Sequence, residues 1–202
     1  VWATDLWISA AENAKRIRAA GLSDKVVPLH ADARSLPFAA GFFDAIIAVD
    51  SYPYYGTDDL YLNYLVNFVK EGGQIGVAGA ALTQEMTSPV PEHLAPIWGQ
   101  DFWCLHSAGW WRRLWERTGL VEIEAAEPMT DGWKVWIAWH SQAHPDNKAE
   151  IEALRADAGS FLGYTRIIGR RQERVELADY AWPDNLKSFP EHYEELPMLK
   201  SG

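Results

Sequence analysis

The sequence predicts an α/β protein built on a largely parallel sheet with helices on both faces. Strand-like and helix-like patterns alternate along residues 1–80, which is typical of sheets whose strands are joined by right-handed crossovers. Residues 43–49 (FDAIIAV) form a continuous apolar run, as in a strand buried on both faces of a parallel sheet. A proline-rich segment without clear periodicity, residues 81–105, then interrupts the alternation.

The chain begins with the pattern of a strand, a helix and a second strand. Residues 1–4 read as the end of a strand, and residues 26–30 as a short apolar strand. Between them, Ser9 and Glu12 have the spacing of a capping box, in which two side chains satisfy amides at the start of a helix. We expect this helix to stop at Gly21, which can adopt a left-handed conformation.

A further helix and strand are expected after the apolar run. Thr57 or Asp58 can cap a helix that ends at the pair Gly72 and Gly73. Residues 74–80 then form the next strand.

The second half of the chain completes the sheet. Ser107 caps a predicted helix, and the alternating residues 121–126 follow as a strand. Asp131 can cap another helix, residues 147–158 form a last one, and residues 163–169 (GYTRIIG) form the final strand.

These elements predict one domain over residues 1–171. Within it, the irregular residues 81–105 are expected to form a lid or substrate-binding segment, because such segments at a sheet edge usually carry function. Residues 172–202 are acidic and interrupted by prolines, and we expect an extended tail there.

Composition narrows the class of protein. The net charge of −10 repels phosphate backbones, so nucleic acid is set aside as the substrate. Cys104 is the single cysteine, which fits a reducing, cytoplasmic location. No apolar stretch reaches the length of a membrane span. No spacing of metal ligands is visible, so no metal is predicted.

Four segments carry a family resemblance. In chain order they are ATDLWIS, HADARSLPF, FDAIIAVDSYPYYG and VKEGGQIGVAG. Together they resemble the class I methyltransferases that depend on S-adenosylmethionine (SAM), in particular the small-molecule branch often labelled type 11. The resemblance extends from Val1 to about Arg171 and implies a Rossmann-like sheet with strand order 3-2-1-4-5-7-6.

The resemblance implies a cofactor site in the first third of the chain. Asp5 would accept hydrogen bonds from the two ribose hydroxyls of SAM, as an acid does in dinucleotide folds. Leu6 and Trp7 would flank the adenine ring. Asp32 would accept from the adenine amino group, and the amide of Ala33 would donate to the ring. Asp5 can also be read as a strand terminus, and Asp32 as an acid that caps a loop.

Polar residues follow the apolar strand, where ligands of open α/β sheets bind. Asp50, Ser51 and Tyr52 are expected beside the methionine part of SAM and the reactive methyl group, although Asp50 can also be read as a plain turn residue. Because SAM is already activated, alignment and proton removal are the main tasks of the protein. Tyr52, Tyr54 and His106 are the candidate catalytic residues, although for any single one of them a structural role is the commoner one.

The predicted lid is rich in aromatic residues. Trp98, Phe102 and Trp103 are expected to form the pocket of a small-molecule methyl acceptor together with Tyr52 and Tyr54. Aromatic faces suit apolar or cationic molecules. The rival interpretation places these rings in the general core.

The sequence departs from the family at one point: it has no counterpart of the first strand and of the glycine-rich loop. Because that strand is central, its loss would leave backbone groups unpaired on both sides at about 1–3 kcal/mol each. We therefore expect upstream residues, or another chain, to supply it.

The functional prediction is a SAM-dependent methyltransferase that acts on a small-molecule acceptor. The expected partner is that small-molecule acceptor, and no binding to nucleic acid or to a membrane is expected. A homodimer is one assembly that the prediction allows. A non-catalytic, methyltransferase-like binding protein is the first alternative. A nicotinamide-dependent oxidoreductase is a second, since Asp5 would also suit a ribose contact there.

Overall fold

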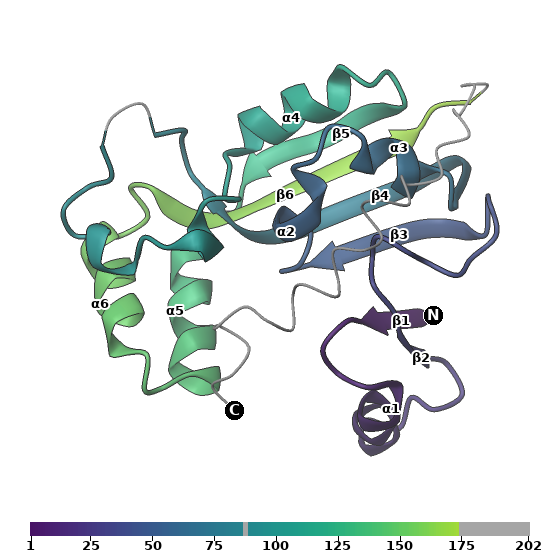
Figure 1. Ribbon diagram of the computed structural model, residues 1–202, viewed down its shortest axis with the longest axis horizontal. Helices are drawn as coiled ribbons and strands as arrows, with labels where there is room; N and C mark the ends of the chain where they lie inside the picture. The colour runs from purple at the N-terminus through teal and green to yellow at the C-terminus, as the bar shows by residue number, and fades with distance from the viewer. Residues whose placement is uncertain (87–88, 174–202) are drawn as a thin grey trace. The chain divides into compact units, whose positions relative to one another are not determined.

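The computed structural model describes residues 1–86 and 89–173 (Figure 1). These residues divide into two compact units, of which the first is Val1–Ala39 and the second begins at Ala40. The tail predicted from residue 172 onward falls almost entirely outside the described residues.

The first unit is a strand–helix–strand motif. Strands β1 (Trp2–Asp5) and β2 (Val27–His30) pair in parallel, with Asp5 opposite His30 at their carboxyl ends. Helix α1 (Ala10–Ala19) connects them. The Ser9 hydroxyl accepts from the amide of Glu12 at 3.2 Å, and Gly21 has a φ of 69°, so the predicted start and stop of this helix are confirmed.

The second unit is a four-stranded sheet with the order β3-β4-β6-β5. Its strands are β3 (Phe43–Val49), β4 (Val69–Leu82), β5 (Val121–Pro128) and β6 (Leu162–Arg171). β3 and β4 are parallel, and β6 is antiparallel to both β4 and β5. With the strands numbered as in the expected fold, the two sheets hold the orders 3-2 and 4-5-7-6.

Two predictions about the strands were wrong. β3 is not buried on both faces: among the described residues it pairs only with β4, and Ile47 and Val49 are 78% and 63% exposed. β4 begins before the glycine pair rather than after it, because a register shift opposite Phe43 and the φ of 71° at Gly72 accommodate the pair within the strand.

The first helices of this unit are shorter than predicted. α2 (Pro53–Gly56) and α3 (Tyr61–Val66) replace the single helix expected up to the glycine pair. Thr57 follows the end of α2, and the Asp58 carboxylate accepts from the amide of Leu60 at 2.7 Å just before α3.

Three longer helices follow, and the cap predicted at Ser107 is confirmed. α4 (Ala108–Glu116) is capped by Ser107, and α6 (Lys148–Asp157) by Asn147. α5 (Gly132–Ala143) follows Asp131, whose side chain makes no capping bond. Asp131 instead has a left-handed backbone and pairs with Lys134 at 2.9 Å, so its predicted role as a cap was wrong.

The helices cover both faces of β6. Trp115 of α4 lies against Gly169, where an added Cβ would come within 3.0 Å of the indole ring. Trp136 of α5 stacks on Tyr164 at 5.9 Å between ring centroids. Because residues 164 and 169 are an odd number apart in a strand, they point to opposite faces.

The predicted lid is partly integrated into the core. It contains two short 3-10 helices, η1 (Ala95–Ile97) and η2 (Gln100–Phe102). Leu94 and Phe102 are buried in one cluster with Trp136. His93 contacts the buried carboxylate of Asp157 at 3.0 Å and ties the segment to α6.

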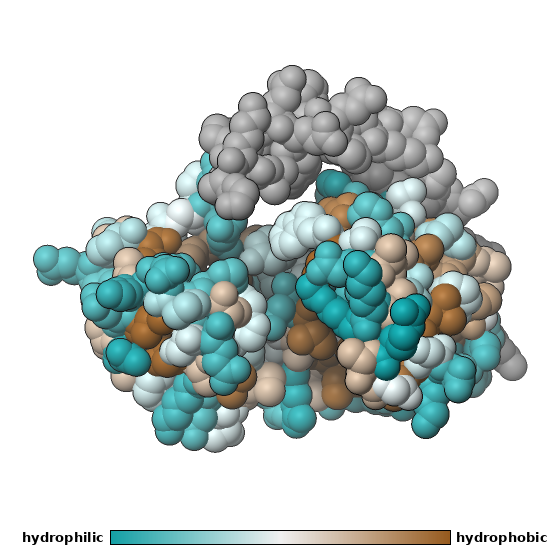
Figure 2. Space-filling view, turned by 90° about the horizontal axis from the view of Figure 1, so that it is seen from below, coloured by the Kyte–Doolittle hydropathy of each residue, from teal (hydrophilic) through white to brown (hydrophobic). Residues whose placement is uncertain are grey.

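Large apolar side chains are also exposed in both units. In Figure 2 such residues lie between hydrophilic ones on the face shown. Trp7 and Trp103 are among the most exposed, at 78% and 67%.

An aromatic cluster at the α2–α4 contact should determine the stability of the second unit. Trp115 is fully buried and its ring centroid lies 5.8 Å from that of Tyr52. We expect Trp115→Ala to lower the free energy of unfolding by about 3–5 kcal/mol, because a large buried ring leaves a cavity. Trp103→Ala is the matched control and should change it by less than about 1 kcal/mol. Chemical denaturation of both variants measures the difference, and equal losses would contradict this account of the core.

Candidate functional site

The first unit gathers its predicted site residues at the carboxyl edge of its two strands. Asp5 ends β1, and its backbone oxygen accepts from the amide of Ala31 at 3.1 Å, which brings the loop after β2 alongside. The Asp5 Oδ1 accepts from the amides of Trp7 and Ile8, both at 2.8 Å. The second carboxylate oxygen accepts no hydrogen bond from the residues that the structure describes. It is therefore free for a ligand.

Two apolar side chains flank this carboxylate. Leu6 and Trp7 are 48% and 78% exposed. The Leu6 carbonyl lies 2.7 Å from Nε2 of His30, which fixes the loop across the strand ends. An acid with a free oxygen beside exposed apolar side chains suits a ligand that has hydroxyls next to a flat ring.

Asp32 lies in the adjoining loop, immediately before Ala33, and is already paired. Its Oδ2 accepts from Nη2 of Arg34 at 2.7 Å, and its Oδ1 from the amide of Arg34 at 2.8 Å. Burial opposes ionisation, but these bonds and the charge of Arg34 outweigh it and hold the pKa of Asp32 below its ordinary value. An adenine amino group would have to share this carboxylate with Arg34.

The second unit has its own polar edge after β3. Asp50 has a left-handed backbone, with a φ of 52°. Its Oδ1 accepts from the amide of Ala80 at 3.2 Å, and its Oδ2 lies 3.5 Å from the hydroxyl of Tyr164. Burial raises the pKa of Asp50 despite these two bonds. A side chain at position 79 would crowd the carboxylate, and the glycine there leaves it room.

The next residues differ in accessibility. The Ser51 hydroxyl is hydrogen-bonded to that of Tyr55 at 3.0 Å. Tyr52 is fully buried against Trp111 and Trp115, and burial raises the pKa of its phenol far above the ordinary value. The structure thus places Tyr52 in the core and away from solvent, in contrast to the expected place beside the reactive methyl group.

Tyr54 is accessible and has acidic surroundings. Its side chain is 54% exposed. Burial of the hydroxyl, together with Cys104 and neighbouring carboxylates, raises the pKa of Tyr54 to about 12. Those carboxylates belong to Asp101, Asp50 and Glu150. The phenol therefore stays protonated at neutral pH and can donate a hydrogen bond.

An aromatic row extends from the predicted lid to β6. Trp98 contacts Phe102 at 5.4 Å, Phe102 stacks on Trp136 at 6.0 Å, and Trp136 stacks on Tyr164. The hydroxyl of Tyr164 points to Asp50. The predicted lid aromatics thus connect to the polar edge of the sheet, through two residues that the sequence did not single out.

His106 is held by a partner that the sequence analysis missed. Its Nδ1 lies 3.3 Å from the carboxylate of Glu85, which also accepts from the amide of Ser107 at 2.6 Å. A glutamate in a segment without periodicity gives no signal in the sequence, because its pairing depends on the return of the chain from residue 85 to residue 106.

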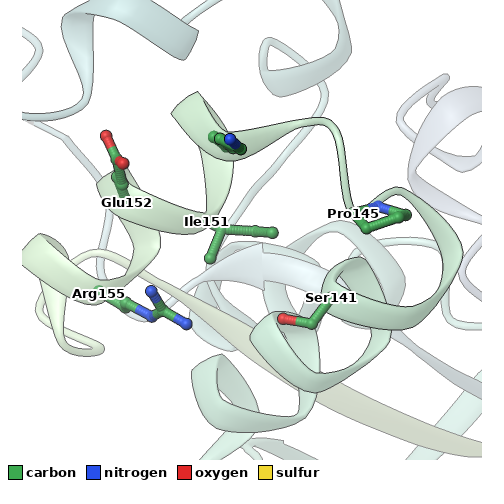
Figure 3. A pocket seen from close by; sticks show the side chains of 6 residues that line it. Ser141, Pro145, Ile151, Glu152 and Arg155 are labelled. Atoms are coloured by element: carbon green, nitrogen blue, oxygen red, sulfur yellow. The ribbon is translucent and has the colours of Figure 1, made fainter.

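A separate pocket of about 300 Å³ lies between α5 and α6 (Figure 3). It is lined by Ser141, Pro145, Lys148, Ile151, Glu152 and Arg155. None of these residues comes from a strand end, whereas ligands of open α/β sheets bind at the carboxyl ends of the strands.

Other classes of site were also sought. Within residues 1–86 and 89–173, no group of three His, Cys, Asp or Glu side chains is placed to hold a metal ion. No helix in this part of the chain is long and apolar enough to cross a membrane.

Comparison with known proteins shows similarity in fold. No protein-family model matches the chain, and no curated protein matches it in sequence. Geranyl diphosphate methyltransferase, solved in complex with SAM, matches with a TM-score of 0.62 and 21% identity over 85% of this chain and 68% of its own. A putative sarcosine dimethylglycine methyltransferase from Galdieria sulphuraria matches with a TM-score of 0.61 and 15% identity, over 86% of this chain and 70% of its own.

The chain has the class I methyltransferase fold. This agrees with the strand orders 3-2 and 4-5-7-6 in its two sheets. The [4+2]-cyclase SpnF also matches, with a TM-score of 0.61 and 20% identity over 85% of this chain and 65% of its own. The chain thus spans about two thirds of the length of these proteins. Because one of them is described as a cyclase, the methyltransferase fold does not by itself fix the reaction.

The carboxyl of Asp50 should make stability depend on pH. Its pKa is higher in the folded chain than in the unfolded chain, so its contribution is greatest below the ordinary carboxyl pKa and falls as the pH rises through the folded-state pKa. Asp50→Asn cannot ionise, keeps an acceptor for Ala80 and tolerates the left-handed backbone. We expect the melting temperature of Asp50→Asn to be higher than that of wild type at pH 7 and equal to it below about pH 4.

A control with the opposite sign is available in Asp44. Its ion pair with Lys70 lowers the pKa of this exposed carboxyl, so Asp44→Asn should not raise the melting temperature at pH 7. Thermal unfolding across this pH range measures both variants. A melting temperature for Asp50→Asn that stays below wild type at pH 7 would show that the charge of Asp50 stabilises the fold.

Proposed function

We propose that the protein is a SAM-dependent methyltransferase acting on a small-molecule acceptor. The observation that carries the proposal is the carboxyl edge of the first unit, where Asp5 has a free carboxylate oxygen beside the exposed Leu6 and Trp7. The class I methyltransferase fold and a structural neighbour solved with SAM support it.

The roles of the cofactor residues follow from their contacts. Asp5 would accept from the ribose hydroxyls with its free oxygen, while its other oxygen keeps the loop in place through Trp7 and Ile8. Asp32 and the amide of Ala33 would contact the adenine from the adjoining loop.

The acceptor would bind along the aromatic row of the second unit. Trp98 is partly exposed and Trp103 is largely exposed, whereas Phe102 supports them from the core. Tyr54 would donate a hydrogen bond to the acceptor. In methyl transfer the acceptor atom attacks the methyl carbon in line with the breaking carbon–sulfur bond, so alignment by these residues contributes directly to the rate.

A non-catalytic or differently reacting protein is the competing proposal, favoured by the similarity to a structure described as a cyclase. The two proposals differ in turnover rather than in fold. Formation of S-adenosylhomocysteine in the presence of acceptors supports methyl transfer. Binding of SAM without its consumption supports the alternative, and binding of NAD instead of SAM would indicate an oxidoreductase.

Replacing Asp5 should weaken SAM binding without unfolding the loop. Asp5→Asn keeps the acceptor for Trp7 and Ile8 but loses the charge. We expect binding weaker by about 1.5–3 kcal/mol, the range for a charged hydrogen-bonded partner. Asp32→Ala should cost less, because its partner on adenine is neutral. Calorimetry on the natural full-length protein measures both, and unchanged affinity in Asp5→Asn would remove the assignment.

Replacing Trp103 should affect the acceptor and spare the cofactor. Trp103 is 67% exposed, so its loss leaves the core intact. At about 25 cal/mol per Å² of apolar surface buried by an acceptor, loss of this ring removes on the order of 1–2 kcal/mol of acceptor binding. Trp103→Ala should therefore raise the KM for the acceptor about tenfold, with SAM affinity and melting temperature unchanged. A lower melting temperature with normal turnover per folded molecule would instead place Trp103 in the structural core.

A further inference from the structure

Glu85 and His106 are brought together at the carboxyl edge of the second sheet. Glu85 lies shortly after the end of β4, and His106 lies just before α4. The two segments are joined where the amide of Leu82 donates to the carbonyl of His106 at 3.3 Å, and where Leu82 forms a parallel bridge with Ser107. Ligands of open α/β sheets bind at this edge.

The contacts of Glu85 determine which nitrogen of His106 carries the proton. Burial opposes ionisation of Glu85, but hydrogen bonds from Ser107 and His106 outweigh it, so the pKa of Glu85 lies below its ordinary value. An ionised carboxylate can only accept hydrogen bonds. Nδ1 of His106 must then be the donor, and in the neutral ring the lone pair lies on Nε2.

The plane of the imidazole is fixed as well. It stacks on the indole of Trp110 with centroids 3.7 Å apart and an angle of 7°, and the edge of Trp111 closes one side. The side chain of His106 remains 24% exposed. Within the described part of the chain, Nε2 of His106 makes no hydrogen bond, so a basic nitrogen in a fixed orientation is available to a ligand.

We propose that His106 is the general base of methyl transfer and that Glu85 is its positioning residue. This rests on the proposed function and narrows the acceptor to one whose reacting atom has both a lone pair and a proton to lose, such as a hydroxyl or a primary or secondary amine. A tertiary amine with a free lone pair would need no base.

The step balances as follows. A lone pair of the acceptor oxygen or nitrogen forms the bond to the methyl carbon. The carbon–sulfur bond breaks, and its electron pair stays on sulfur, giving S-adenosylhomocysteine. The acceptor proton moves to Nε2 of His106, and Glu85 stabilises the resulting imidazolium. The proton is later released to water.

A purely structural role for Glu85 would need only its bond to the amide of Ser107. The tautomer of His106 distinguishes the two roles without any acceptor. In protein labelled with ¹⁵N-histidine, long-range proton–nitrogen NMR should show the neutral ring of His106 protonated on Nδ1, with the signals assigned by their loss in His106→Gln. A ring protonated on Nε2 would overturn the proposal.

The pH profile of the reaction provides a second readout. Glu85→Gln keeps one oxygen that can accept from Nδ1, gives up the acceptor for the amide of Ser107, and removes the charge that favours the imidazolium. The acidic limb of the pH profile should therefore move to lower pH, with most of the turnover retained at pH 8. Glu85→Ala should show the same shift and about tenfold or greater loss of kcat, because the ring also loses its orientation. Arg113 of α4 lies along Gly109 and is unchanged in all variants, so the shift reports Glu85 alone.

Turnover variants complete the test. Formation of S-adenosylhomocysteine from SAM is followed with a panel of phenols, alcohols and primary amines, including tyramine, which offers both groups. His106→Gln should lower kcat about 10²–10⁴-fold with SAM affinity unchanged, whereas His144→Gln, an exposed histidine of the same protein, should match wild type. Equal turnover in wild type and His106→Gln would overturn the proposal.

Two outcomes separate this inference from the proposed function. Failure of the wild-type protein to bind SAM contradicts the proposed function itself, whatever the tautomer of His106. If the protein binds SAM but methylates no member of the panel, both the proposal of a proton-bearing acceptor and the role of His106 as a base are contradicted. The proposed binding of SAM is not affected by that result.

Discussion

The antiparallel pairing of β4 with β6 organises the second unit. It runs from Gln74 opposite Arg170 to Leu82 opposite Leu162, and so places the start of the last strand beside the end of a central one. Tyr164 thereby reaches Asp50, and the helices that precede β6 return to the same edge as the loop after β3. The contact between the aromatic row and Asp50 depends on this register, because a slip by one residue would turn Tyr164 to the opposite face of the sheet.

Aromatic side chains divide into two sets on the two faces of β6. Tyr52, Trp111 and Trp115 fill the space under α4 and stabilise the sheet. Phe102, Trp136 and Tyr164 form the row that leads toward Asp50. The abundance of tryptophan in the chain therefore has two explanations, one structural and one connected with the proposed acceptor.

The electrostatics of the second unit suit an acceptor that loses a proton. Burial raises the pKa values of Tyr54 and Tyr164, the carboxylates of Asp50 and Glu150 add to this rise, and both phenols stay protonated. Such surroundings favour cationic or neutral ligands over anionic ones. The proposed base, His106, lies with Glu85 in the return segment before α4, so the same edge combines hydrogen-bond donors, aromatic faces and a proton acceptor.

The sequence by itself determined the elements that depend on local chemistry. The cap at Ser9, the glycine stop at Gly21 and the cap at Ser107 were predicted correctly, because each depends on local backbone geometry or on bonds within one turn of a helix. The reciprocal half of the capping box was wrong, since the Glu12 carboxylate pairs with Arg16. The strand orders 3-2 and 4-5-7-6 within the two sheets were also predicted, through the family resemblance. The acid that ends β1 was recognised in the same way, and its role in binding remains a prediction.

Tertiary structure decided everything that depends on residues distant in the sequence. Burial of Tyr52, exposure of Ile47 in β3, and the pairing of Glu85 with His106 are set by packing and by return of the chain across the sheet, which hydrophobic periodicity does not record. The glycine pair at the start of β4 illustrates the same limit. Glycine permits a helix stop and a strand bulge equally, and only the register against β3 selected the bulge.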